Sequence, residues 1–182
     1  MSARPSTTEF APFYNGYIQL VNASSVSEAL EKYADKILAF YTQIPAAAAN
    51  YKYADNKWTL KEMLQHVLDT ERIMSYRLLR IARNDQTPLA GFDENAYAAA
   101  ANVDHRSWES MVEEFRLLRQ TTHALCHSLH ESDWTKMGTA SGQPISARAL
   151  GFILLGHLLH HKNIIVERYA AGPGMADYLS LG

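Results

Sequence analysis

The sequence contains a single cysteine, Cys126, among its 182 residues, which excludes an internal disulfide. One thiol is compatible with a reducing compartment but does not prove one. No apolar run reaches about 18 residues, the length expected of a membrane-spanning helix, so we expect no membrane segment. The first ten residues hold no apolar stretch typical of a secretory signal peptide. These absences favour a soluble, cytoplasmic protein with no membrane partner.

The chain also lacks an excess of charge of either sign. Lys and Arg number 17 against 19 Asp and Glu, which gives a net charge of −2, and the basic residues form no block. Bulk electrostatics therefore argue against a nucleic-acid partner. A length of 182 residues with 47% hydrophobic content suits one domain with a substantial core.

Four segments carry apolar residues at spacings of three and four, which is typical of amphipathic helices. Each begins at a residue that can cap a helix N-terminus, and Thr59 with Glu62 forms a capping box. With no convincing strand pattern, and a loop expected over 137–144, we predict an all-α four-helix bundle. The predicted helices begin near Ser25 or Ser27, at Thr59, at Asp104 or Ser107, and at Ser146.

Residues 1–24 are rich in aromatic side chains and also contain Pro5, Pro12 and Gly16. Segments of this composition usually lie against the protein body, so we expect an N-terminal arm that packs on it. Residues 25–182 then form a single bundle domain. Gly172-Pro173-Gly174 is expected to end the fourth helix, near Ala171.

The fourth predicted helix carries His157 and His161 on its apolar face. Residues four apart lie about 40° apart around a helix axis, so the two rings point the same way. A pair at this spacing is a standard way for one helix to bind a metal ion. His66 lies at the edge of the apolar stripe of the second helix. If the two helices are neighbours, three imidazoles can share one ion and leave a coordination position open. The alternative is three unrelated structural histidines.

Two further residues are candidates for acid–base roles near such a site. Glu71 falls within the apolar stripe of the second helix, and a buried carboxylate needs a partner. It could form an ion pair with an arginine, orient a ligand imidazole, or act as a base. His160 lies at the edge of the apolar stripe of the fourth helix. There its side chain either contacts the metal-binding histidines without binding the ion or is exposed to solvent.

A rival cluster with ligand-like spacing consists of His123, His127 and His130. It lies on the flank of the third helix, so we expect it to be partly exposed. Cys126 faces the core and is expected to be an inert small hydrophobe.

The fourth helix has a second apolar face, which consists of Phe152, Leu155, Leu159 and Val166. A helix that is apolar on two sides needs two covers. Either the aromatic arm or the partner in a homodimer can supply the second cover.

Several short motifs, in this order along the chain, are similar to those of a known family. They are Glu9-Phe10-Ala11-Pro12-Phe13-Tyr14, Lys57-Trp58-Thr59 with Glu62 and His66, Arg106-Ser107, and Gly156-His157-x-x-His160-His161. By these motifs the chain resembles the DinB/YfiT-like superfamily, in its DinB-like branch. The resemblance implies a four-helix bundle, often dimeric, with a divalent metal held by His66, His157 and His161.

Relatives in that family include S-transferases and isomerases that use low-molecular-weight thiols, and proteins proposed to be metal-dependent hydrolases. The leading hypothesis is therefore a metal-dependent thiol transferase or hydrolase acting on a small molecule, with Glu71 and His160 as acid–base candidates. Zinc and nickel fit three histidines best, and iron and manganese are further candidates. The alternatives are a non-catalytic metal-binding or stress-response protein and a plain helical dimer with structural histidines.

Overall fold

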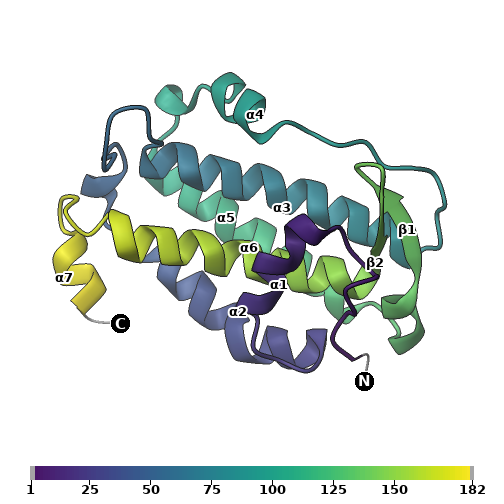
Figure 1. The fold of residues 1–182 in the computed structure, drawn as a ribbon. Helices are drawn as coiled ribbons and strands as arrows, with labels where there is room; N and C mark the ends of the chain where they lie inside the picture. Colours follow the sequence, from purple (N-terminus) through teal and green to yellow (C-terminus); the bar gives the residue numbers. More distant parts are fainter. Residues whose placement is uncertain (1–2, 181–182) are drawn as a thin grey trace.

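The computed structural model describes residues 3–180, so the ends of the predicted arm and of the predicted domain, residues 1–2 and 181–182, lie outside the described residues. Four long helices form the bundle, as predicted (Figure 1). They are α2 (Val26–Thr42), α3 (Leu60–Ala82), α5 (Trp108–His127) and α6 (Ala147–Arg168).

Each long helix begins where a side chain satisfies the free backbone N–H groups of its first turn. The hydroxyl of Ser25 accepts from the N–H of Glu28, and Ser107 and Ser146 cap α5 and α6 in the same way. Thr59 and Glu62 form the predicted capping box at the start of α3. The four predicted helix starts are therefore confirmed, with Ser25 and Ser107 as the caps.

Helix α6 lies at the centre of the molecule and packs against α1, α2 and α3 (Figure 1). Its length and composition alone would allow it to cross a membrane, but 67% of its most apolar window is buried inside the protein. The core helix of a globular fold has the same composition, because it must be apolar on every covered side.

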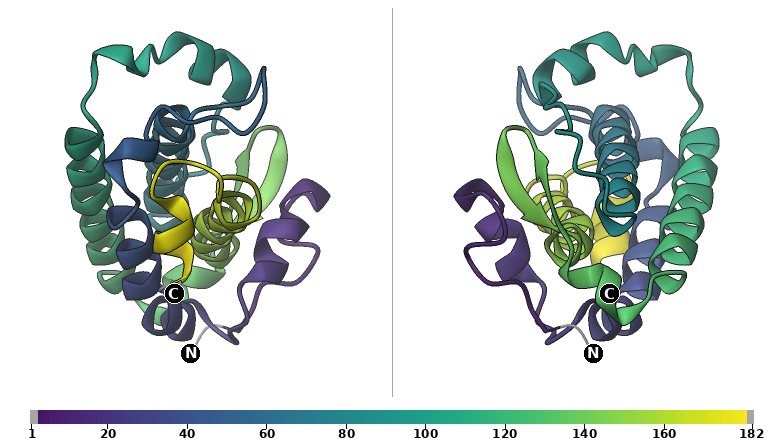
Figure 2. Two further views of the ribbon diagram at one scale, coloured as in Figure 1. Left: turned by 90° about the vertical axis from the view of Figure 1, so that its left-hand side faces the viewer. Right: turned by 90° about the vertical axis from the view of Figure 1, so that its right-hand side faces the viewer.

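The N-terminal residues supply one cover for α6. The short helices η1 (Pro12–Tyr14) and α1 (Asn15–Leu20) lie beside α6 on the side away from α5 (Figure 2). The guanidinium of Arg4 lies 5.2 Å from the ring centroid of Phe152, on the second apolar face of α6. Farther along the same face, Val166 remains 43% exposed. The arm thus covers part of the second face and leaves its C-terminal end open.

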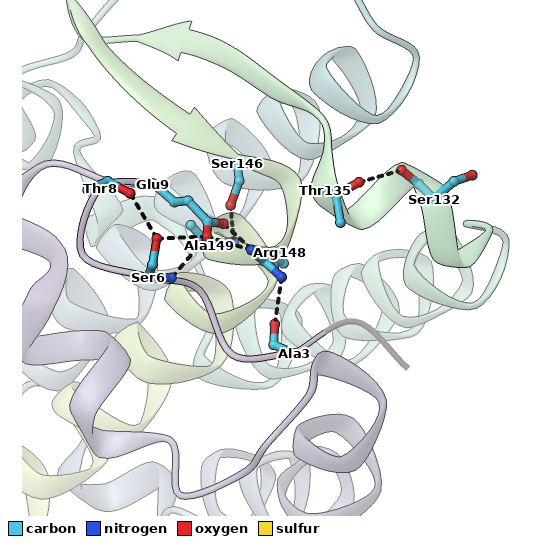
Figure 3. Close-up of polar contacts among 9 residues, drawn as sticks. All are labelled: Ala3, Ser6, Thr8, Glu9, Ser132, Thr135, Ser146, Arg148 and Ala149. Carbon is cyan, nitrogen blue, oxygen red and sulfur yellow. Dashed lines mark hydrogen bonds and ion pairs between the residues drawn. The ribbon is translucent and has the colours of Figure 1, made fainter.

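An ion pair fixes the arm to the first turn of α6. Two guanidinium nitrogens of Arg148 donate to the Glu9 carboxylate at 2.6 Å, and Ser6 donates to the same carboxylate through its backbone and its hydroxyl at 3.0 Å (Figure 3). Arg148 also donates to the Ala3 carbonyl at 3.3 Å. Because the pair is half-buried and bidentate, it holds the arm more firmly than an exposed pair would.

The prediction of a loop over 137–144 was wrong. These residues form a hairpin of strands β1 (Met137–Ala140) and β2 (Gln143–Ser146). Ser141 and Gly142, at its two-residue turn, have φ angles of 53° and 73°, as hairpin turns with a right-handed strand twist require. Strands of four residues show too little alternation for a pattern search, so only the Ser-Gly turn signalled them.

Shorter elements connect the bundle helices. Helices α4 (Glu94–Ala100) and α7 (Met175–Ser180) are short and lie outside the four predicted helices. The connecting 3₁₀ turns are η2 (Ala46–Ala48), η3 (Val103–His105) and η4 (Glu131–Thr135).

The close approach of α1 to α6 gives a direct test of this packing. A Cβ atom at Gly156 would overlap the backbone carbonyl of Tyr17. We expect Gly156→Ala to lower the free energy of unfolding by about 1–3 kcal/mol, measured by chemical denaturation, because packed backbone must move. Gly16→Ala is the matched control, since nothing lies within 4 Å of its added carbon. Equal stability of the two variants would contradict the packing.

Candidate metal centre

Three imidazoles from two helices meet beside the middle of α6. Nε2 of His157 lies 3.0 Å from Nε2 of His66 on α3 and 3.1 Å from Nε2 of His161. Each of the three residues is only 6% exposed. The pairing of His157 with His161 follows from helical spacing, whereas His66 joins them only because α3 packs against α6.

Hydrogen bonding alone does not satisfy this arrangement. A neutral ring nitrogen carries either one proton or one lone pair, so Nε2 of His157 can make one good hydrogen bond and has two nitrogen neighbours. A shared cation satisfies all three lone pairs at once. Zinc binds imidazole nitrogen at about 2.0–2.1 Å, and two such bonds at tetrahedral or smaller angles put the nitrogens about 3.0–3.4 Å apart. The observed separations fit that requirement.

The three histidines are held in the protonation state that binds metals. Burial, with a smaller effect of His160, lowers the pKa of His66 to about 4. Burial and the neighbouring histidines lower the pKa of His161 to about 3 and hold that of His157 well below its usual value. All three imidazoles are therefore neutral at pH 7, with lone pairs available for a metal ion.

A cavity of about 270 Å³ lies against His157, and we call it the His157 cavity. Its walls are mainly aromatic and aliphatic, with two aliphatic hydroxyls and one carboxylate among them. Besides His157 it is lined by Phe13, Tyr14, Tyr17, Thr70, Met74, Phe92, Glu94, Ser141 and Ile153. The hydroxyl of Thr70 is buried and has no hydrogen-bond partner among the described residues.

A second cavity, of about 260 Å³, includes His161 in its lining. Trp58 and Lys57 are among its other lining residues. The three-histidine group therefore borders space on two sides, and a small molecule could approach from either.

Two aromatic rings lie against the histidines, and the sequence alone did not predict these contacts. The ring centroid of Trp58 lies 5.0 Å from that of His66, and the centroid of Tyr17 lies 5.5 Å from that of His157. Trp58 was visible only as part of the motif before the capping box, and Tyr17 only as part of an aromatic arm. Their rings restrict the rotation of the imidazoles and shield them from water.

The structure shows a partner for Glu71. Its carboxylate, on a residue 3% exposed, accepts from Arg119 on α5 at 2.8 Å. Of the three roles considered for Glu71, an ion pair with an arginine is therefore the one with a visible partner. The second carboxylate oxygen has no hydrogen-bond partner among the described residues. A role for Glu71 as catalytic base stays a prediction.

His160 lies beside the centre, half-buried. Its ring centroid is 5.2 Å from that of Tyr17 and 5.1 Å from that of His161. Burial lowers the pKa of His160, with partial opposition from Glu167 and Glu94. Its role in acid–base chemistry also stays a prediction.

The rival histidines do not form a comparable site. His123 and His127 have Nε2 atoms 3.2 Å apart on the exposed side of α5, but His130 caps η4 and pairs with Asp133. Within residues 3–180, His66, His157 and His161 are the only group of three potential ligands close enough to share an ion. Cys126 is buried, and burial raises the pKa of its thiol to about 12, as expected of an inert core residue.

Comparisons with known proteins bear on the family and the fold. The sequence model of the DinB superfamily matches residues 29–165. No curated protein matches the chain. Among solved structures, the chain is similar to YfiT from Bacillus subtilis, described as a probable metal-dependent hydrolase with an unusual four-helix bundle topology. The TM-score is 0.66 at 16% identity, over 91% of each chain.

The low pKa values of the buried histidines predict acid sensitivity of the metal-free protein. Histidine in an unfolded chain titrates near pH 6.5, so between about pH 6.5 and 4 the unfolded chain binds more protons than the folded chain. The free energy of unfolding therefore falls as the pH falls. For His66 alone the loss at pH 5 is about 2 kcal/mol, or roughly 4–8 °C in the melting temperature.

The measurement is the melting temperature of chelator-treated protein from pH 7 to pH 5. We expect His66→Gln to make the decline shallower and His127→Gln, on the exposed side of α5, to leave it unchanged. A decline of equal slope in wild type and His66→Gln would show that His66 is not buried in its neutral form.

Proposed function

The chain belongs to the DinB superfamily, and from its three-histidine centre we propose that it is a divalent-metal-dependent enzyme acting on a small molecule. The main support for the proposal is that three buried, neutral imidazoles lie close together beside a cavity. A structural cluster of histidines has no need of that space, whereas a reaction centre does.

His66, His157 and His161 would hold the ion, and their neutral side chains would leave its charge undiminished. Zinc and nickel suit such a ligand set best, with iron and manganese as further candidates. An ion of this kind supplies Lewis acidity, which lowers the pKa of a bound water or thiol toward neutrality.

The protein's own residues would position the substrate and exclude water. Tyr17 contacts the ring of His157 and Trp58 contacts that of His66, and the aromatic wall of the His157 cavity would bind an apolar group. A cavity of about 270 Å³ is smaller than most sites for drug-sized ligands, which favours a small substrate. His160, whose ring lies against that of Tyr17, is the proposed group for carrying a proton to or from the cavity.

Two reaction classes fit this centre: hydrolysis, and transfer of a low-molecular-weight thiol to an electrophile. The description of YfiT as a probable metal-dependent hydrolase supports the first. The two cavities, one at His157 and one at His161, support the second, because thiol transfer brings together two organic molecules. A non-catalytic metal-binding or stress-response protein is the alternative, and it predicts a closed coordination sphere with no exchangeable position.

We also retain the proposal of a cytoplasmic homodimer. The exposed end of the second apolar face of α6, around Val166, supports it. Light scattering at micromolar concentration should give twice the 20.5 kDa mass of the chain, and a monomeric mass would contradict the proposal.

Metal content tests the proposed centre. We expect purified, untagged protein to contain close to one divalent ion per chain by plasma mass spectrometry, and His66→Ala to lose it, because two ligands from one helix bind far more weakly than three. The matched control is His127→Ala, which removes a histidine from the exposed pair on α5 and should leave the metal content unchanged.

The loaded protein would then be assayed with ester and amide panels and with small thiols plus an electrophile. Activity that disappears in His157→Ala would support an enzyme. Absence of metal from wild type after reconstitution, or full retention in His66→Ala, would contradict the proposal.

A further inference from the structure

Arg77 on α3 is buried without a counter-ion. The residue is only 1% exposed, and no carboxylate of the described residues lies within ion-pair distance of its guanidinium. The other buried or half-buried arginines of this region are paired: Arg80 with Asp85 and Arg119 with Glu71. A buried charge without an opposite charge is costly, so the position of Arg77 requires an explanation.

The groups that contact the Arg77 guanidinium are neutral. One guanidinium nitrogen donates to the Ala90 carbonyl at 2.7 Å and to the Ser141 hydroxyl oxygen at 3.1 Å. A second guanidinium nitrogen lies 3.7 Å from the Met74 sulfur, and the guanidinium carbon is 5.9 Å from the ring centroid of Phe92. These contacts hold the guanidinium in place but leave its positive charge uncompensated.

Three of these four partners line the His157 cavity: Met74, Phe92 and Ser141. The charge of Arg77 therefore lies directly behind one wall of that cavity. Because Arg77 itself is buried, water screens its charge less than that of an exposed arginine, and the charge makes that wall attractive to an anion.

Ser141 is the residue that can donate a hydrogen bond to an anionic ligand beside the Arg77 charge. Its oxygen accepts a hydrogen bond from Arg77, which leaves its own proton free to be donated. Its φ of 53° lies in the left-handed region, where glycine or asparagine is favoured at a hairpin turn. The hairpin turn itself requires this φ, and the turn places Ser141 in the lining of the cavity.

We propose that Ser141, backed by Arg77, forms a carboxylate-binding subsite in the His157 cavity, so that the cavity takes a small carboxylate with an aromatic or aliphatic body. Naming that ligand the substrate rests on the proposed function, whereas the binding itself does not. Phe13, Tyr17 and Ile153 provide the apolar wall for the body of the ligand.

One lining residue carries a negative charge that disfavours an anion, and its position indicates where in the cavity the subsite lies. Glu94, the first residue of α4, is exposed and contributes a carboxylate to the same cavity. A bound carboxylate is repelled by Glu94 and attracted by Arg77, so it lies at the Ser141 end. Removing the charge of Glu94 should therefore strengthen binding.

The test compares benzoate with benzamide, which has a similar shape and no charge. Binding to the zinc-loaded full chain would be followed by calorimetry and by NMR chemical-shift changes. We expect benzoate to bind at least about tenfold more tightly than benzamide, as a hydrogen bond to a charged group implies. Equal affinity for the two probes would overturn the proposal.

Three variants locate the binding. Ser141→Ala should weaken benzoate about tenfold and weaken benzamide less, because a hydrogen bond to a neutral carbonyl is the weaker one, and Glu94→Gln should strengthen benzoate. Arg77→Gln should remove the preference for benzoate over benzamide, provided that this variant folds. If it does not fold, Ser141→Ala and Glu94→Gln still test the subsite. Unchanged benzoate affinity in Ser141→Ala would overturn the proposal.

The same samples separate this inference from the proposed function. If benzoate binding depends on zinc and is indifferent to Ser141, the carboxylate binds the metal, so the subsite is refuted and the metal centre stands. If the protein binds no zinc, the metal centre fails, and the benzoate preference of the metal-free protein still decides the subsite.

Discussion

The packing of α3 against α6 is the contact on which the site depends. It places Nε2 of His66 3.0 Å from Nε2 of His157, and Nε2 of His161 lies close to the same atom. Hydrogen bonds cannot satisfy the ring nitrogens of all three neutral imidazoles at once. The surrounding core holds them there, since each residue is only 6% exposed. A buried polar cluster of this kind requires a compensating partner, and a cation shared by the three nitrogens would provide it.

The central position of α6 explains why so small a bundle can hold this cluster. The helix is covered by α2, α3 and the N-terminal arm, and glycines allow the closest approaches. Gly156, next to His157, lets the Tyr17 backbone contact α6, and Gly151 accommodates Val26 and Trp134. The arm is thus part of the site's wall, because the same contact that covers α6 places the Tyr17 ring against His157.

The sequence predicts what depends on neighbours along the chain. Helix starts follow from Ser25, Thr59, Ser107 and Ser146, whose hydroxyls cap nearby N–H groups, and the His157–His161 pair follows from helical spacing. Features that depend on packing between helices could be stated only as hypotheses. The approach of His66 is the main example, and resemblance to a family, rather than geometry, supported it.

Other features could not be predicted, because the sequence pattern that encodes them is too short or too common to be recognised. The strands of the β1–β2 hairpin are four residues long, too short for their alternation to be distinguished from chance. Arg77 lies on a helix with two other arginines, and only the three-dimensional fold shows that it is buried without a carboxylate. Glu71 was recognised as buried from its place in the apolar stripe, but its partner Arg119 comes from another helix.

X-ray absorption spectroscopy of the zinc-loaded protein tests the central claim most directly, because it reports the ligands of the ion itself. We expect three imidazole nitrogens at about 2.0–2.1 Å with at least one further light atom, and a loss of one imidazole in His66→Ala. A spectrum with two imidazoles or fewer in wild type, or one unchanged by His66→Ala, would contradict a metal centre shared between α3 and α6.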